Sequence, residues 1–254
     1  MSKYYKSNGL YDYLDSNPNP SLKFPKGELW ALIYADKEDN FEPRVLALVI
    51  GVNETGKIVN NAVETRKLLR QISTRTGLPL VTIVFRTDLP TIEEVDYSVG
   101  DNKLMKISLK QLADELKDLG LPLNDLPTSH AINKASSSAY QNWQRENLGN
   151  KIVAVDIDMF KVSDQGDLVR FYELKRSFQS FEDWKPYVDD YNNFRALSKL
   201  ANQTGVEFDI VYNIRTNNPW NDNVQELNVF NVDFSKQTPI SEGRRISLSD
   251  FMEY

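Results

Sequence analysis

Two short runs near the middle of the chain limit what it can fold into. Residues 153–160 are mostly apolar and β-branched, which favours a buried strand. Residues 168–176 are again rich in apolar and aromatic residues. The polar segment between them, residues 161–167, contains the glycine and aspartates that a tight turn needs. The pattern therefore predicts two adjacent strands joined as an antiparallel hairpin.

Charged side chains occupy alternate positions on both predicted strands. Asp156 and Asp158 are two residues apart, as are Glu173 and Lys175, and such pairs share one face of a strand. In the folded hairpin the carboxylates of Asp158 and Glu173 can converge, with the ammonium of Lys175 beside them. These ligands suit Mg²⁺, which takes one or two carboxylates from a protein and keeps several waters. Lys175 could then polarise or deprotonate a water, or contact a phosphate.

A second interpretation of the hairpin stays open. The same charges could form a solvated face that protects a strand from edge-to-edge aggregation. Against this, Val153, Ala154 and Val155 read as buried on both faces. Aspartates that continue such a run are costly to bury without a cation or polar partners. We therefore expect a metal site and keep the charged hairpin as the alternative.

The spacing resembles the PD-(D/E)XK nuclease superfamily, which includes restriction endonucleases, junction resolvases and repair nucleases. That family carries an acid at one strand end and an acid-x-lysine triplet on the next strand. Here the acid is Asp158, with Asp156 as a second candidate, and the triplet is Glu173, Leu174 and Lys175. The proline that often precedes the first acid is absent. The resemblance covers roughly residues 135–215.

The resemblance implies a Mg²⁺-dependent hydrolase of phosphodiester bonds, a DNA endonuclease in which Mn²⁺ can replace Mg²⁺. Asp158, Glu173 and Lys175 would be catalytic, and Asp158, Glu173 and Asp156 would hold the metal. The alternative is a non-catalytic member of the same fold that binds nucleic acid or another protein. A third possibility is an unrelated interaction protein with a charged hairpin, which would not respond to a metal.

Basic residues near the hairpin are the candidates for binding nucleic acid. Arg176 follows the triplet directly, Lys161 and Lys185 are close in sequence, and Arg145 lies on the helix that enters the core. Such side chains neutralise phosphates and position a nucleic acid. Nearby aromatic side chains could stack on bases or belong to the core: Tyr140, Trp143, Trp184, Tyr187 and Tyr191.

The rest of the chain predicts an α/β protein with a mixed central β-sheet flanked by helices. The restriction endonuclease-like core would lie in the C-terminal half, residues 126–254 with the tail. An additional N-terminal α/β region, residues 1–125, would supply specificity or dimerisation, with a seam near residues 121–130. We expect strands at 29–35, 44–52, 78–85, 206–214 and 229–234, helices at 61–72, 109–119, 136–146 and 189–201, and an irregular segment at 1–27.

One strand of the PD-(D/E)XK core is not clearly supplied by any segment of this sequence. It should lie between the first helix and the metal hairpin, where only residues 147–150 are available. Either residues 78–85 supply it, with 87–150 as an insertion, or it comes from elsewhere. Glu64 in the first case, or Glu146 in the second, could add an acid to the site, although a solvated helix face explains either glutamate.

Composition bounds the remaining possibilities. The chain has no cysteine, which excludes thiolate sites and fits a reducing cytoplasm. Its one histidine, His130, lies in a predicted loop, and no phosphate loop or Gly-x-Ser-x-Gly elbow is present. No apolar run approaches the ~20 residues of a transmembrane helix, so we expect no membrane partner. A net charge of −6 requires a local basic patch for nucleic acid. Cleavage of both DNA strands would favour a homodimer.

Overall fold

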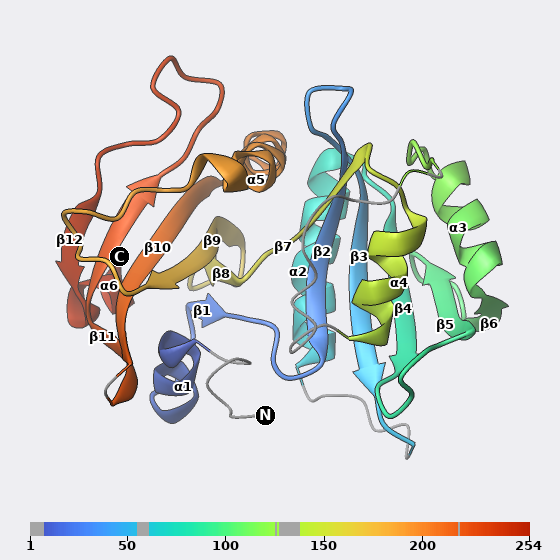
Figure 1. Cartoon of the computed structure of the whole chain (residues 1–254), viewed down its shortest axis with the longest axis horizontal. Helices are drawn as coiled ribbons and strands as arrows, with labels where there is room; N and C mark the ends of the chain where they lie inside the picture. Colours follow the sequence, from blue (N-terminus) through green and yellow to red (C-terminus); the bar gives the residue numbers. More distant parts are fainter. Residues whose placement is uncertain (1–7, 55–60, 125, 127–137, 218) are drawn as a thin grey trace. The chain divides into compact units, whose positions relative to one another are not determined.

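The structure, a computed structural model, describes residues 8–54, 61–124, 126, 138–217 and 219–254. These residues form an α/β fold with two six-stranded mixed sheets, each flanked by helices (Figure 1). The chain divides into two compact units. Unit 1 consists of Met1–Phe24 and Asp158–Tyr254, and unit 2 is Pro25–Ile157. The predicted α/β class is confirmed, with two sheets in place of one central sheet.

This division differs from the expected boundary at residues 125 and 126. Helix α4 (Ala139–Asn147) and strand β7 (Ile152–Asp156) fall in unit 2, because β7 pairs antiparallel with β2 (Leu29–Asp36). The expected seam at 121–130 is only partly within the described residues, and Leu121 packs in the core of unit 2. Unit 2 is therefore an insertion into unit 1, not an N-terminal half.

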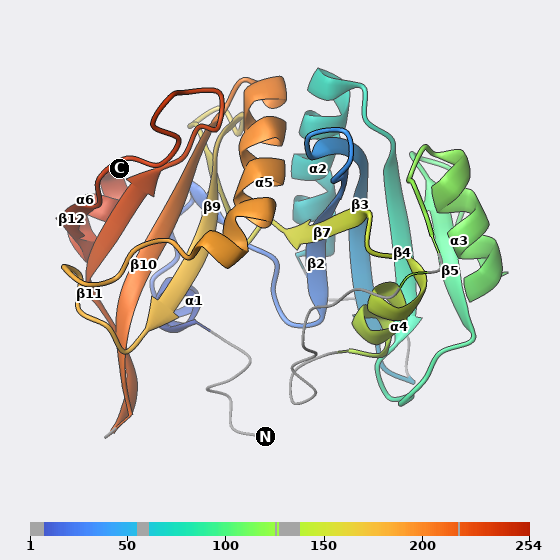
Figure 2. The same cartoon turned by 45° about the horizontal axis from the view of Figure 1, so that its top comes forward.

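Unit 2 has its sheet between two layers of helices (Figure 2). The strand order is β6-β5-β4-β3-β2-β7, with β3 at Glu42–Val52, β4 at Leu80–Arg86, β5 at Glu94–Val99 and β6 at Met105–Ser108. Strands β3 and β4 are parallel because helix α2 (Ala62–Thr76) crosses between them, and the other pairs are antiparallel. Helix α2 covers one face, and α3 (Leu109–Asp118) and α4 cover the other.

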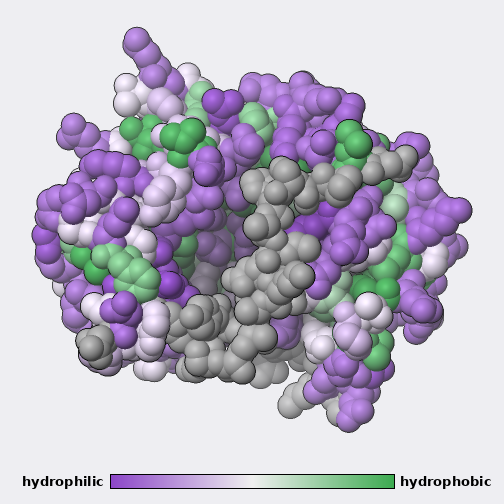
Figure 3. Space-filling view, viewed as in Figure 1, coloured by the Kyte–Doolittle hydropathy of each residue, from purple (hydrophilic) through white to green (hydrophobic). Residues whose placement is uncertain are grey.

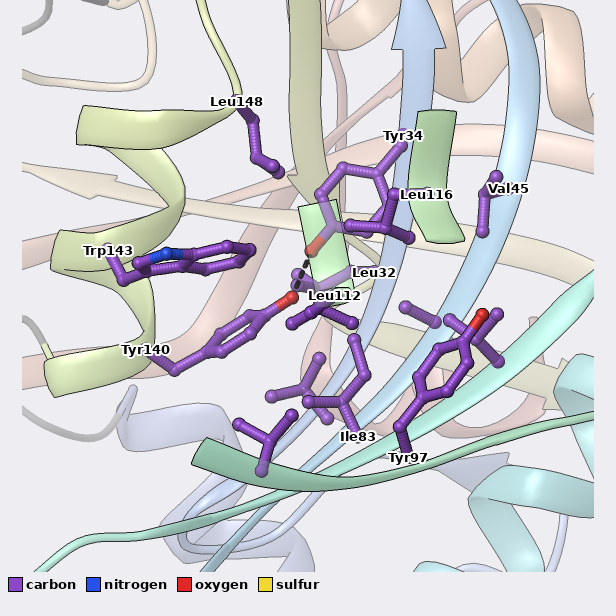
Figure 4. Close-up of a cluster of buried hydrophobic side chains, with 14 of the residues drawn as sticks. Leu32, Tyr34, Val45, Ile83, Tyr97, Leu112, Leu116, Tyr140, Trp143 and Leu148 are labelled. Carbon is purple, nitrogen blue, oxygen red and sulfur yellow. Dashed lines mark hydrogen bonds between the residues drawn. The ribbon is translucent and has the colours of Figure 1, made fainter. Parts of the chain in front are cut away.

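Buried tyrosines occupy the core under α3 and α4 (Figure 4). The hydroxyls of Tyr34 and Tyr140 are 2.7 Å apart, and Tyr34 donates to Gln144 Oε1 at 2.8 Å. Burial raises the pKa of both tyrosines, so both hydroxyls stay protonated. Tyr140 and Trp143 are thus core residues of unit 2, which excludes them as platforms for bases.

Unit 1 is built around a sheet with the order β1-β8-β9-β10-β11-β12. These strands are β1 (Leu22–Lys23), β8 (Met159–Val162), β9 (Leu168–Ser177), β10 (Glu207–Asn217), β11 (Trp220–Asn231) and β12 (Arg244–Ser247). Helix α5 (Tyr191–Thr204) joins β9 to the parallel strand β10, and the other pairs are antiparallel. Helix α5 lies on one face of the sheet, and helices α1 (Gly9–Ser16) and α6 (Leu248–Glu253) lie on the other.

The predicted hairpin is present, but its first strand is shorter than expected. Strands β8 and β9 pair antiparallel, with Met159 opposite Tyr172 and Phe160 opposite Phe171. Residues 153–160 are not one strand, because β7 pairs with β2 in unit 2 and β8 pairs with β9 in unit 1. On its other side β8 pairs with β1, from a segment expected to be irregular.

The face of the molecule in Figure 3 has no large apolar patch among the residues that the structure describes. Hydrophilic residues predominate on the face in Figure 3, where hydrophobic residues form small groups. Among the described residues, no helix is long and apolar enough to cross a membrane.

Helix α1 links the N-terminus to the C-terminal half of the chain. Asn8 caps it by accepting a hydrogen bond from the Leu10 N–H at 2.9 Å. Leu10 and Leu14, one turn apart, are buried against Met159 and Tyr172 of the hairpin strands in one hydrophobic cluster. The interior of unit 1 therefore includes residues from both ends of the sequence.

Leu10→Ala tests this assignment. Leu10 is 1% exposed, so its truncation should destabilise the protein by about 2–5 kcal/mol through lost burial and a cavity. Val63→Ala, at a residue exposed on α2 of unit 2, is the matched control and should change stability by less than about 0.5 kcal/mol. Urea unfolding with hydrogen exchange measures both. Faster exchange in β2 and β3 but not in β9 and β11 would contradict the assignment.

Candidate functional site

Asp158 stands where the chain enters unit 1, directly before β8. Its Oδ2 accepts a hydrogen bond of 2.7 Å from the backbone N–H of Leu174, the middle residue of the acid-x-lysine triplet. The Asp158 carbonyl oxygen accepts a 2.9 Å hydrogen bond from the Tyr11 hydroxyl on α1. These two contacts hold the Asp158 carboxylate beside the triplet, although 14 residues lie between Asp158 and Glu173 in the sequence.

The triplet places its two charged residues on the face of the sheet covered by α5. Tyr172 and Leu174 pack with the hydrophobic cluster on the opposite face, so Glu173 and Lys175 point the other way. Lys175 Nζ lies 5.5 Å from the ring centroid of Phe194 on α5. The hairpin register thus gives Glu173 and Lys175 a common face, with Leu174 behind them.

The ammonium of Lys175 lies between two carboxylates. Its Nζ is 3.0 Å from Glu173 Oε1 and 3.1 Å from Asp190 Oδ2, at the start of α5. The Glu173 side chain is nearly buried, with 7% exposure, and Lys175 compensates its charge. Burial alone would lower the pKa of Lys175, but Glu173, Asp190 and Asp158 outweigh it and raise that pKa. Lys175 therefore remains protonated at neutral pH.

Together these four side chains form an acidic cluster. Three carboxylates, on Asp158, Glu173 and Asp190, and one ammonium give a formal net charge of −2. The donor oxygens are of the type that Mg²⁺ and Mn²⁺ prefer, and a divalent cation would neutralise the cluster. Within the described parts of the chain, no group of three or more His, Cys, Asp or Glu is arranged to hold a metal by itself. A metal here would complete its coordination with water or substrate oxygens.

Asp190 was not singled out from the sequence. It lies in an acidic turn, Val188–Asp190, just before the helix that follows the triplet strand. Its position after the predicted hairpin was the only available signal, and that signal does not distinguish it from the exposed Asp189 beside it.

Asp156 is not part of this cluster's strand. It lies on β7 opposite Leu32 of unit 2, and the next residue, Ile157, still donates its N–H to the Ala31 carbonyl oxygen. The expectation that Asp156 and Asp158 lie on one face of one strand is therefore wrong. Glu64 on α2 and Glu146 on α4 are exposed residues of unit 2.

The four basic candidates are in different environments. Arg176 Nη1 is 2.5 Å from Asp222 Oδ2, so its charge is balanced within the sheet. Lys161 Nζ donates to the Glu253 carbonyl oxygen at 3.4 Å, and Lys185 is exposed in the loop before α5. Arg145 lies on α4 in unit 2. Of these, Lys185 is the most accessible to a phosphate.

The aromatic candidates in unit 1 also separate into two kinds. Trp184 is buried and stacks on Tyr212 at a centroid distance of 4.1 Å. Tyr187 is exposed and forms a T-shaped contact with Trp184, and Tyr191 is half-buried at the start of α5. Trp184 therefore serves the core, and Tyr187 alone of these three is open to a ligand.

No protein family model and no curated protein matches the sequence. Among solved structures, Candida albicans Rai1 in complex with pU5-Mn2+ is similar at 11% identity and a TM-score of 0.21, over 82% of this chain and 74% of that one. Two sex pheromone precursor structures each have a TM-score of 0.16. One is from Lactobacillus salivarius (12% identity, 91% and 74% coverage), and the other is the C-terminal domain of the Staphylococcus aureus staph-cAM373 precursor (9%, 87% and 69%). Similarities this weak carry no conclusion about fold or function.

Lys175→Met tests the ion pairs. It should destabilise the protein by about 2–3 kcal/mol, less than for a fully buried pair because the Lys175 side chain is 23% exposed. The raised pKa makes this stabilisation fully present below the ordinary lysine value of 10.5 and lost only as the pH rises past the higher folded value. The difference from wild type, measured by urea unfolding, should therefore persist up to about pH 9.

Lys185→Met is the control for this measurement. Because Lys185 is exposed, its substitution should change the free energy of unfolding by less than about 0.5 kcal/mol. Equal stability of Lys175→Met and wild type would mean that the two ion pairs contribute nothing to folding.

Proposed function

We propose that the chain is a Mg²⁺-dependent nuclease that hydrolyses phosphodiester bonds, with DNA as substrate and with unit 1 as its catalytic part. The observation that carries this proposal is the convergence of Asp158, Glu173 and Lys175 at one end of the β8–β9 hairpin. The order of elements adds support, since α5 leads from β9 to a parallel strand, as in the PD-(D/E)XK arrangement that the sequence resembles.

The roles of the residues follow from their charges. Asp158 and Glu173 would hold a Mg²⁺ ion, which when bound supplies Lewis-acid polarisation of a phosphate oxygen and of water. Lys175 keeps its proton, so it orients water by donating a hydrogen bond and offsets the negative charge that develops on the phosphate oxygens. A general-base role would need a neutral lysine, which the raised pKa disfavours. Asp190 positions Lys175 through the second ion pair.

A non-catalytic binding module on the same fold is the second candidate. It is favoured by the absence, among the described residues, of a group of three acids arranged to hold a metal. In that case the ion pairs of Lys175 with Glu173 and Asp190 would only stabilise the fold. A response to Mg²⁺ and cleavage of DNA separate the two candidates.

We also propose a cytoplasmic location, supported by the lack of cysteine. Unit 2 would supply specificity or a dimer contact, since cleavage of both strands of a duplex suits two copies of a site related by a two-fold axis.

Asp158→Asn tests the metal site. Mg²⁺ at about 100 times its Kd should stabilise the wild type by about 2.7 kcal/mol, seen as a higher Tm in calorimetry. The asparagine oxygen can still accept the Leu174 N–H, so the variant should fold and lose only the response to Mg²⁺. Asp164→Asn, in the exposed turn between β8 and β9, should keep it. A wild-type Tm that neither Mg²⁺ nor Mn²⁺ changes would contradict the metal site.

Cleavage of plasmid DNA, and of a single-stranded circular DNA beside it, tests the role of Lys175. Below its melting temperature, Lys175→Met should lower kcat by about 100-fold or more, because the lost ammonium acts on developing charge. Its DNA affinity, measured by anisotropy, should change by less than about threefold, because affinity comes from other phosphate contacts. Lys185→Met should show the reverse, weaker binding with kcat retained. Parallel loss of binding and cleavage in Lys175→Met would assign the residue to affinity instead.

A further inference from the structure

Two large aromatic side chains lie exposed together at one end of the unit 1 sheet. Phe178, directly after β9, is 50% exposed, and Trp220, at the start of β11, is 54% exposed. Their ring centroids are 5.9 Å apart with the planes tilted by 55°. The Arg215 guanidinium lies over the Phe178 ring, 4.7 Å from its centroid. We call Phe178, Trp220 and Arg215 the aromatic patch.

Strand register places the aromatic patch at the same strand ends as the acidic cluster, on the opposite face of the sheet. Phe178 follows Lys175 by three residues, about 10 Å along an extended chain. In the register of β10 and β11, Arg215 lies opposite Asp222 and Asn217 lies opposite Trp220. Arg215 and Trp220 therefore share a face of the sheet. Asp222 binds Arg176, whose side chain points away from Lys175. The patch is thus on the other face of the sheet but at the same strand ends.

The composition of the patch indicates the chemistry of its ligand. Half-exposed aromatic rings offer flat faces on which a flat ligand can stack, and the Arg215 guanidinium over Phe178 adds positive charge beside one of them. Bases offer the flat π-faces and phosphates the matching negative charge, so both parts of the patch fit a nucleic acid. A duplex hides its base faces in the helical stack, whereas a single strand exposes them.

We propose that the aromatic patch binds single-stranded nucleic acid by stacking bases on Phe178 and Trp220, with Arg215 contacting the backbone. This inference names the substrate class of the proposed nuclease and rests on that function for its catalytic meaning. A flexible single strand held on the patch can pass the end of β9 and present a phosphodiester to the cluster of Asp158, Glu173 and Lys175. The patch then selects single strands, or duplexes with single-stranded ends, as substrates.

Fluorescence anisotropy with a labelled DNA strand of about 12 nucleotides, its RNA counterpart and the matching duplex tests the patch directly. EDTA in the buffer separates binding from cleavage. Trp220→Ala and Phe178→Ala should each weaken single-strand binding about tenfold, whereas Trp220→Phe should keep most of the affinity. Leu89→Ala, at an exposed residue of unit 2, is the control and should bind as wild type does.

The outcomes separate this inference from the proposed nuclease function. Loss of single-strand affinity in the alanine variants, for DNA or RNA and with duplex binding little changed, supports the patch even if no cleavage is ever detected. Unchanged affinity in both alanine variants overturns it, even if Lys175→Met shows the protein to be a nuclease. A wild type that binds duplex more tightly than single strands, or binds neither, also overturns it.

Discussion

The Glu173 carboxylate is the constraint on which the arrangement of unit 1 depends. A carboxylate this deeply buried in a sheet needs a cation, and Lys175, two residues along the same strand, supplies it. That ammonium also binds Asp190, which fixes the start of α5 against β9. The hydrogen bond from Leu174 N–H to Asp158 fixes the start of β8 in the same way. One charged triplet therefore connects β8, β9 and the crossover helix that leads to β10.

The sequence predicts the parts of this fold that carry a strong period. The strands near 29–35, 44–52 and 78–85 and the helices at 61–72 and 109–119 are present with small shifts of their ends. Their apolar positions repeat over two or more helical turns, or over several residues of a strand, and this period identifies the type of element. The hairpin after Asp158 is predictable for the same reason. Its acid-x-lysine spacing also places Glu173 and Lys175 on one face without knowledge of the strand's partners.

What the sequence does not reveal is which segments become neighbours. The sequence pattern of residues 153–160 is the same for one continuous strand and for two strands in different sheets. The break between Asp156 and Met159 therefore has no local signal. Strand β1 and helices α1 and α6 are too short to show a period, and they are held by a core built from both chain ends. Asp190 was missed because its role depends on contact with Lys175 across the sheet face.

The position of unit 2 in the chain follows from the same geometry. Its two junctions, at Phe24 and at Asp158, adjoin the paired strands β1 and β8. The last described sheet contact of unit 2 is the hydrogen bond from Ile157 N–H to Ala31, and the next residue is Asp158. A single peptide bond thus separates the end of unit 2 from the first carboxylate of the acidic cluster. One of the two junctions of unit 2 therefore lies in sequence directly beside Asp158, whose side chain is hydrogen-bonded to the acid-x-lysine triplet.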